Sequence, residues 1–143
     1  SLKVATRGAV DCESANGRRP VAGITMRILE WDLVDDNDVL NVTKTNSSGS
    51  YYLEGEEDEV FRRTIFFVES WYPCSGPVYD QCTNLAYHAQ CDSLKQRGTC
   101  HYVIEHVLIP KANYYTEAKD KVVYDAGRFS MDLDKKSKTY MKC

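Results

Sequence analysis

Apolar and polar residues alternate along several short segments of this chain. In Gly23–Trp31 the apolar residues Ile24, Met26 and Ile28 occupy every second position, and His101–Ile109 alternates in the same way. Side chains of a β-strand point in turn to opposite faces of the sheet, so this period of two predicts strands with one buried face. Such strands are typical of antiparallel sheets that pack one face against a core.

The remaining segments also favour strands, because they are short and rich in β-branched and aromatic residues. Gly49 closes a hairpin turn that begins at Asn46, since glycine adopts a positive φ without steric cost. Thr83–Gln90 is the one short helical candidate. Further expected strands are Val4–Val10, Asn41–Thr45, Ser50–Gly55, Thr64–Tyr72, Val122–Tyr124 and Phe129–Leu133. The pattern predicts an all-β protein, a two-sheet β-sandwich of seven or eight strands in a single domain over residues 1–143.

The number and spacing of the cysteines indicate the cellular compartment in which the protein resides. Six cysteines occur in 143 residues, an even number without a tight Cys-x-x-Cys pair that would suggest a metal site. Three disulfides, and hence a secreted protein, are therefore expected. The chain opens on a strand-like segment, which we interpret as a mature form from which a signal peptide has been removed.

Two sequons, Asn41-Val42-Thr43 and Asn46-Ser47-Ser48, fit the secretory route. Asn46 lies in the expected turn and is the better glycan acceptor of the two. No apolar run approaches the roughly 18–20 residues that a membrane-spanning helix requires. The net charge of −3 gives no overall attraction to nucleic acid. We therefore expect an extracellular glycoprotein without a transmembrane segment.

Several motifs follow one another in a recognisable order. Thr45–Gly55 has the form Thr-x-x-x-Gly-x-aromatic-x-Leu-x-Gly, with Tyr51 and Leu53 at or near the expected places. The other segments in this order are Gly8–Cys12, Pro20–Asp32, Asp35–Leu40, Cys74, Cys100–Pro110, Asp125–Leu133 and Cys143. Together they resemble the nematode transthyretin-like family over most of the chain. The resemblance implies a transthyretin-like sandwich, secretion and a non-catalytic role, in some members as soluble adaptors between cell surfaces that recognise anionic lipid.

The resemblance also marks four framework cysteines, and it implies a disulfide pattern. Cys74 ends one expected strand and Cys100 begins its antiparallel neighbour, so these two form the first expected pair. Between them lies an insertion at about residues 75–99, where the family has a short connection. A bond between Cys82 and Cys91 would brace this insertion from inside. Cys12–Cys143 is the remaining pair, while a bond from Cys74 to Cys82 stays an open alternative.

No catalytic site is expected. With all six cysteines paired, no thiol is spare for nucleophilic catalysis. His101 and His106 are five residues apart on one strand, so alternation puts them on opposite faces, where they cannot share a metal ion. Enzymes on the transthyretin fold have a terminal Tyr-Arg-Gly-Ser, whereas this chain ends with Lys138–Cys143. We therefore expect no enzyme activity, no cofactor and no resident metal.

Two charged segments leave alternatives open. One is an acidic loop whose carboxylates could ligate Ca²⁺, although a solvated acidic turn is the simpler interpretation. Its residues are Asp32, Asp35, Asp36 and Asp38. The other is a group of C-terminal lysines that could contact an anionic lipid surface, although lysines near a terminus are usually only solvated. Its residues are Lys135, Lys136, Lys138 and Lys142.

The insertion is the strongest functional lead in the sequence. The candidate partner-binding residues in and beside it are Trp71, Tyr72, Tyr79, Tyr87 and His88. Rigid aromatic side chains lose little entropy on binding, which suits protein recognition, although they could equally form a small core for the loop itself. The sequence thus favours an extracellular binding or adaptor protein. The alternatives are a carrier of a small apolar ligand or anionic lipid and, more weakly, an inhibitor or host-directed effector; the oligomeric state and the partner stay open.

Overall fold

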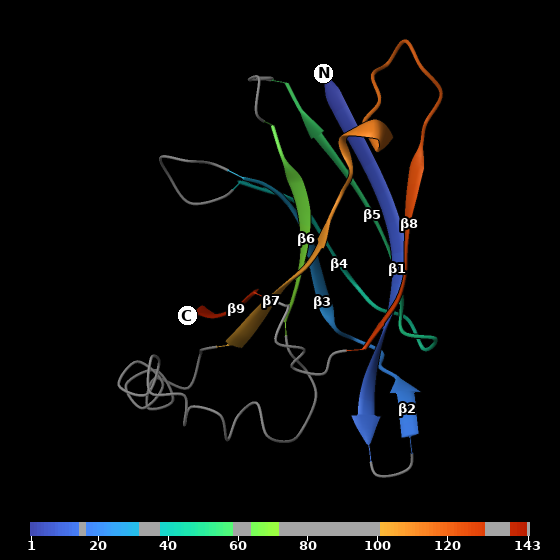
Figure 1. The fold of residues 1–143 in the computed structure, drawn as a ribbon, viewed down its shortest axis with the longest axis vertical. Helices are drawn as coiled ribbons and strands as arrows, with labels where there is room; N and C mark the ends of the chain where they lie inside the picture. The colour runs from blue at the N-terminus through green and yellow to red at the C-terminus, as the bar shows by residue number, and fades with distance from the viewer. Residues whose placement is uncertain (15–16, 32–37, 59–63, 72–100, 131–137, 143) are drawn as a thin grey trace.

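Two β-sheets packed against each other make up the structure, a computed structural model that describes residues 1–14, 17–31, 38–58, 64–71, 101–130 and 138–142 (Figure 1). These residues form nine strands and one short 3₁₀ turn, η1 (Lys111–Asn113). The all-β, two-sheet sandwich predicted from the sequence is confirmed. No helix in the described part of the chain is long and apolar enough to cross a membrane.

The first sheet, called the A sheet below, is built around the long strand β1 (Leu2–Ser14). β5 (Ser50–Glu57) pairs with it antiparallel and β8 (Val123–Ser130) pairs with it parallel, so that β1 lies between them (Figure 1). The short strand β2 (Gly17–Pro20) folds back on the end of β1 as a hairpin. The A sheet therefore brings residues near both ends of the chain side by side.

The second sheet, the B sheet, has five strands in the order β4-β3-β6-β7-β9. All of its pairings are antiparallel. The strands are β3 (Thr25–Glu30), β4 (Asp38–Lys44), β6 (Phe66–Trp71), β7 (His101–Leu108) and β9 (Lys138–Lys142). The central strand β6 therefore has a hydrogen-bonded neighbour on each side.

The core lies between the two sheets. It takes alternate residues from both, including Ile24, Met26 and Ile28, the three residues that the alternation in Gly23–Trp31 placed on one face. The other buried members are Val4, Val10, Tyr51, Leu53, Phe66, Val68 and Ile109. Burial of apolar surface contributes roughly 25 cal/mol per Å², so this layer is the main stabilising element of the fold.

The B sheet is also buried on the face that points away from this core. Leu29 and Phe67 alternate with the core residues of β3 and β6, and they are 1% and 5% exposed. Glu69, on the same outward face, is 0% exposed and accepts a hydrogen bond of 2.7 Å from Nη2 of Arg27. Thr64–Tyr72 was predicted as a buried strand, and burial on both faces of β6 confirms this for residues 66–70.

The hairpin turn at Asn46–Gly49 is confirmed. Gly49 has a φ of 72°, and a Cβ at this position would lie 2.4 Å from the backbone oxygen of Val10. Only glycine fits both constraints. Oδ1 of Asn46 accepts hydrogen bonds from the amides of Ser48 and Ser50 at 2.9 and 3.0 Å, which holds the turn in shape.

The strand boundaries differ from the prediction near the end of the chain. Val122–Tyr124 and Phe129–Leu133 were expected as separate strands around a turn at Gly127, but the structure has one continuous strand, β8, over Val123–Ser130. Gly127 has a φ of 73°, and the pairing with β1 shifts register at this point. The glycine therefore forms a bulge that keeps the ladder intact instead of ending it. β2 and β9 were not expected, which brings the described strands to nine.

Candidate functional site

The insertion lies within the segment between β6 and β7, which is called the partner-binding segment below. Two adjacent strands hold the ends of this segment. β6 ends at Trp71, whose Cα partner on β7 is Val103. The segment therefore leaves and re-enters the B sheet on hydrogen-bonded neighbours. The side chain of Trp71 and the whole of Tyr72, Tyr79, Tyr87 and His88 lie outside what the structure describes. Their role as contact residues stays a prediction.

Cys12 is disulfide-bonded and packs, half-buried, against the core near the end of β1. Its partner is outside the described residues, as are the five other cysteines. The predicted connectivity of Cys74 with Cys100, Cys82 with Cys91, and Cys12 with Cys143 therefore stays a prediction.

The two histidines of β7 are separated by an irregularity in the ladder. Val68 of β6 pairs with Val107, but the next residue, Glu69, pairs with Glu105, so His106 is an extra residue in β7. A bulge of this kind interrupts the alternation of faces. The expectation that His101 and His106 face opposite sides rested on an uninterrupted strand, and that premise does not hold here.

The two sequon asparagines differ in what their side chains do. Asn41, on β4, is exposed, and its Nδ2 donates a hydrogen bond of 3.1 Å to the backbone oxygen of Glu54. Asn46 is exposed in the hairpin turn and is held only through Oδ1 in the described part of the chain. The Nδ2 atom that accepts a glycan is therefore more accessible at Asn46.

We expect Asn46 to be the main glycosylated residue when the protein is secreted from eukaryotic cells. Asn46→Gln should remove one glycan from most molecules, because the free Nδ2 is the group that the transferase modifies. Intact-mass spectrometry of Asn46→Gln and of its matched control Asn41→Gln measures this. A loss of glycan mass in Asn41→Gln alone would contradict the expectation.

An open cleft of about 650 Å³ lies over the A sheet, where β1, β5 and β8 meet the turn between β4 and β5. Its charged lining residues are Arg7, Lys44, Asp125 and Arg128. Neither the alternation pattern nor the motifs pointed to this group. Arg7 and Asp125 are 118 positions apart in the chain and meet only because β8 pairs parallel with β1.

The two arginines of the cleft are held differently. Arg128 donates from Nη1 to Oδ1 of Asp11, a carboxylate that is only 5% exposed. Arg7 lies 3.4 Å from Asp125, and both of these side chains are more than half exposed. The first pair is therefore fixed by a buried carboxylate, whereas the second is loose and screened by solvent.

Tyrosines complete one wall of the cleft. Tyr51 packs over Gly8, where an added Cβ would lie 2.6 Å from the tyrosine oxygen. Burial raises the pKa of Tyr51 above its ordinary value, so its hydroxyl stays protonated in alkaline solution as well as at physiological pH. Tyr52 is half-exposed, its hydroxyl donates to Glu54 at 2.6 Å, and Nζ of Lys121 lies 5.1 Å from its ring centre. These contacts fix both rings.

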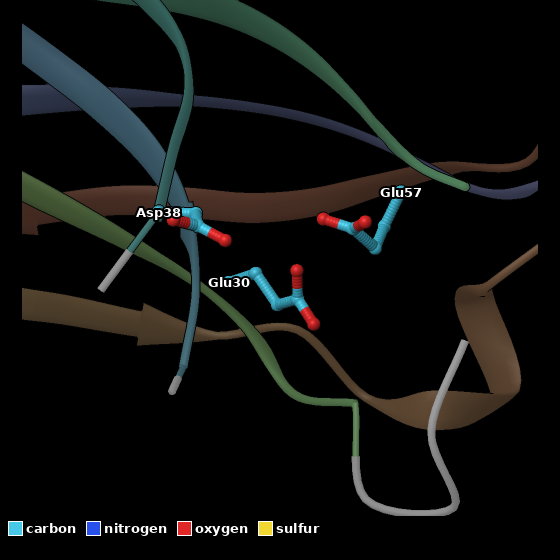
Figure 2. A group of neighbouring side chains, drawn as sticks. All are labelled: Glu30, Asp38 and Glu57. Atoms are coloured by element: carbon cyan, nitrogen blue, oxygen red, sulfur yellow. The ribbon is translucent and has the colours of Figure 1, made fainter. Parts of the chain in front are cut away.

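A second polar group brings together partly exposed carboxylates from both sheets. The carboxylates of Glu30, Asp38 and Glu57, from β3, β4 and β5, have oxygens within 4.8 Å of one another and point toward a common centre (Figure 2). Of the residues proposed from the sequence for Ca²⁺, only Asp38 belongs to this group. Asp32, Asp35 and Asp36 are outside the described residues.

Sequence reasoning missed the other two members of this acidic group. Glu30 lies opposite Asp38 in the β3–β4 ladder, and Glu57 is the last residue of β5. Carboxylate oxygens are the ligands that Ca²⁺ prefers, so the group could hold such an ion. Exposed acidic clusters also occur without a metal, and among the described residues no further feature at this position indicates a cation.

Two of the four C-terminal lysines lie among the residues that the structure describes. Lys138 and Lys142 are the first and last residues of β9, which pairs with β7 at the edge of the B sheet. Lys135 and Lys136 lie in the part of the chain that is left undescribed. Whether these lysines act together on an anionic surface stays a prediction.

Comparison with known proteins finds structural similarity but no sequence match. No model of a protein family matches the chain, and no curated protein matches it. Among solved structures, a 9R-lipoxygenase from Cyanothece PCC8801 is similar over 90% of this chain, with 10% sequence identity and a TM-score of 0.42. This chain covers 16% of the lipoxygenase. A similarity this weak carries no functional argument.

Proposed function

We propose that the protein is a secreted, extracellular binding or adaptor protein that recognises a protein or cell-surface partner through the segment between β6 and β7. The observation that carries the proposal is the attachment of this segment. Its flanking residues Trp71 and Val103 are paired across two neighbouring strands in the middle of a five-stranded sheet. Binding loops on rigid elements keep their contact groups in place at low entropic cost.

The sequence supports an extracellular setting for this role. Six cysteines, with Cys12 in a disulfide, suit an oxidising compartment, and two sequons suit a glycoprotein. The two-sheet sandwich is the fold that the transthyretin-like resemblance implies. The proposed role is recognition without catalysis, and the predicted pairing of all six cysteines leaves no thiol to act as a nucleophile.

We expect partner binding to be lost when residues 75–99 are replaced by a short glycine-containing turn. This change removes the aromatic contact groups Tyr79, Tyr87 and His88, while β6 and β7 keep their pairing. Binding of labelled protein to cell surfaces, followed by cross-linking and mass spectrometry of the captured partner, measures the effect. Undiminished capture by the shortened protein would contradict the proposal.

A variant with point substitutions distinguishes loss of the aromatic contacts from loss of the whole segment. Tyr79→Ala combined with Tyr87→Ala should weaken binding by at least tenfold if these rings are anchors, since hot-spot aromatic residues contribute about 2 kcal/mol or more each. Tyr52→Ala, which removes a half-exposed ring from the A sheet, is the matched control and should leave binding unchanged. Equal losses in both variants would show that the segment has no special role.

A further inference from the structure

We propose that the cleft over the A sheet binds a small hydroxylated molecule that carries one anionic group, a carboxylate, phosphate or sulfate. This site is separate from the segment proposed for partner recognition. It belongs to β1, β5, β8, the last two residues of β4 and the turn after them, whereas that segment leaves from β6 and returns to β7. The two proposals therefore rest on different residues and can fail independently.

The charge of the lining favours an anion. Three cationic side chains, Arg7, Lys44 and Arg128, and one carboxylate, Asp125, line the cleft. Asp11 pairs with Arg128 from outside the lining, so three positive and two negative side chains leave one net positive charge. Lys44 is exposed and has no ion-pair partner in the described part of the chain. Cationic groups gathered on a concave surface raise the local concentration of anions and bind their oxygens with charge-assisted hydrogen bonds.

Arg128 is positioned for this task by a residue beneath it. Asp11 is only 5% exposed, and it accepts a hydrogen bond from one terminal nitrogen of the guanidinium. Half of the Arg128 side chain remains exposed, and Nη2 makes one long contact of 3.5 Å with the backbone oxygen of Ser48. A guanidinium has five N–H donors in a fixed plane, so donors remain for an oxyanion while Asp11 sets their direction.

Arg7 can exchange its partner. Its Nη2 lies 3.4 Å from Oδ2 of Asp125, and the two side chains are 63% and 60% exposed. An exposed pair at this distance contributes little free energy, so an incoming oxyanion can take the place of the Asp125 carboxylate. The amide of Gly127 donates to the other oxygen of Asp125 at 2.9 Å, which keeps this carboxylate in place as an acceptor for a ligand hydroxyl.

The neutral lining suits the rest of such a ligand. Gly127 also lines the cleft, and no atom lies within 4 Å of the position that a Cβ would take there, so a ligand can approach this part of the backbone closely. Thr43, Asn46 and Ser50 supply neutral polar groups, and the fixed ring of Tyr52 supplies a flat apolar wall. A volume of about 650 Å³ is within the usual range for small-molecule sites. A sugar ring with one acidic substituent matches this combination of groups.

The test uses protein secreted into a bacterial periplasm, where no glycan is added to Asn46 and this lining residue is kept. The probes are glucose 6-phosphate, glucose 6-sulfate, glucuronate, glucose and inorganic phosphate. Titrations followed by NMR at low salt should show at least one acidic sugar binding at millimolar concentration or tighter, with shifts in β1, β5 and β8. Glucose and inorganic phosphate should each bind at least about tenfold more weakly than that acidic sugar. Binding of either control as tightly, or of no acidic sugar, would overturn the proposal.

Substitutions then locate the site. Lys44→Gln and Arg7→Gln should each weaken binding of that sugar by roughly fivefold to tenfold, because each removes one charge-assisted contact. Lys111→Gln, an exposed lysine of η1 that does not line the cleft, is the matched control and should leave the affinity unchanged. Equal losses in Lys44→Gln and Lys111→Gln would show general charge attraction and contradict a built site.

Discussion

Replacing Glu69 with alanine is expected to lower the free energy of unfolding by about 3–5 kcal/mol, the usual cost of breaking a buried ion pair. The Glu69 side chain is 0% exposed, and that of its partner Arg27 is 11% exposed, with 2.7 Å between Oε2 and Nη2. Removal of the carboxylate leaves a guanidinium charge buried without its counterion. Nε of Arg27 is already buried without a hydrogen-bond partner among the described residues, so it adds no compensation. Urea denaturation followed by tryptophan fluorescence measures the loss.

An exposed pair on the other sheet provides the matched control. Asp125→Ala removes the acidic partner of Arg7, but both side chains are mostly in solvent, so the expected loss is below about 1 kcal/mol. The double replacement Arg27→Met with Glu69→Leu should recover much of the loss, since apolar residues can fill a buried ion-pair site. Similar costs for Glu69→Ala and Asp125→Ala would contradict burial of the outward face of the B sheet.

The second large effect concerns the predicted bond between Cys74 and Cys100. In the β6–β7 ladder, Ser70 faces Ile104 and Trp71 faces Val103. Continued for three more residues, this register would set Cys74 opposite Cys100. Directly opposed Cα atoms in an antiparallel pair are about 4.5–5.5 Å apart, which fits the separation that a disulfide requires. Replacing both cysteines with serine should therefore cost about 3 kcal/mol, if the entropy of the unfolded chain dominates.

Peptide mapping without reduction decides the connectivity behind this prediction. The β7–β9 ladder pairs His101 with Lys142, and its continuation would set Cys143 opposite Cys100 as well. Cys100 thus has one candidate partner on each side, and we expect the bond to Cys74. A peptide linking Cys100 to Cys143 would contradict this expectation and would also leave Cys12 without its predicted partner.

Features that depend on short stretches of sequence could be predicted. Alternation placed Met26 and Ile28 in the core, and the turn residue Gly49 adopts the expected positive φ. The continuous strand β8 was not predicted, because a glycine in such a sequence indicates a turn. In the structure, pairing with β1 continues past Gly127, which forms a bulge in the strand. Its conformation is set by a partner strand that local sequence cannot reveal.

The cleft and the acidic group could not be predicted for the same reason. Arg7 meets Asp125, and Glu30 meets Glu57, only after the sheets have formed. A single exposed arginine or glutamate has no sequence pattern that distinguishes a ligand-binding side chain from a solvated one. The candidate partner-binding segment could be predicted because cysteines and aromatic residues are uncommon, so their clustering is visible in the sequence itself.

Hydrogen–deuterium exchange of the protein, alone and with its captured partner, tests most directly whether recognition belongs to the segment between β6 and β7. We predict that bound partner slows exchange of amides in residues 72–100 and leaves β1, β5 and β8 unchanged. Slowed exchange confined to the A sheet, with residues 72–100 exchanging as in the free protein, would contradict the proposed function.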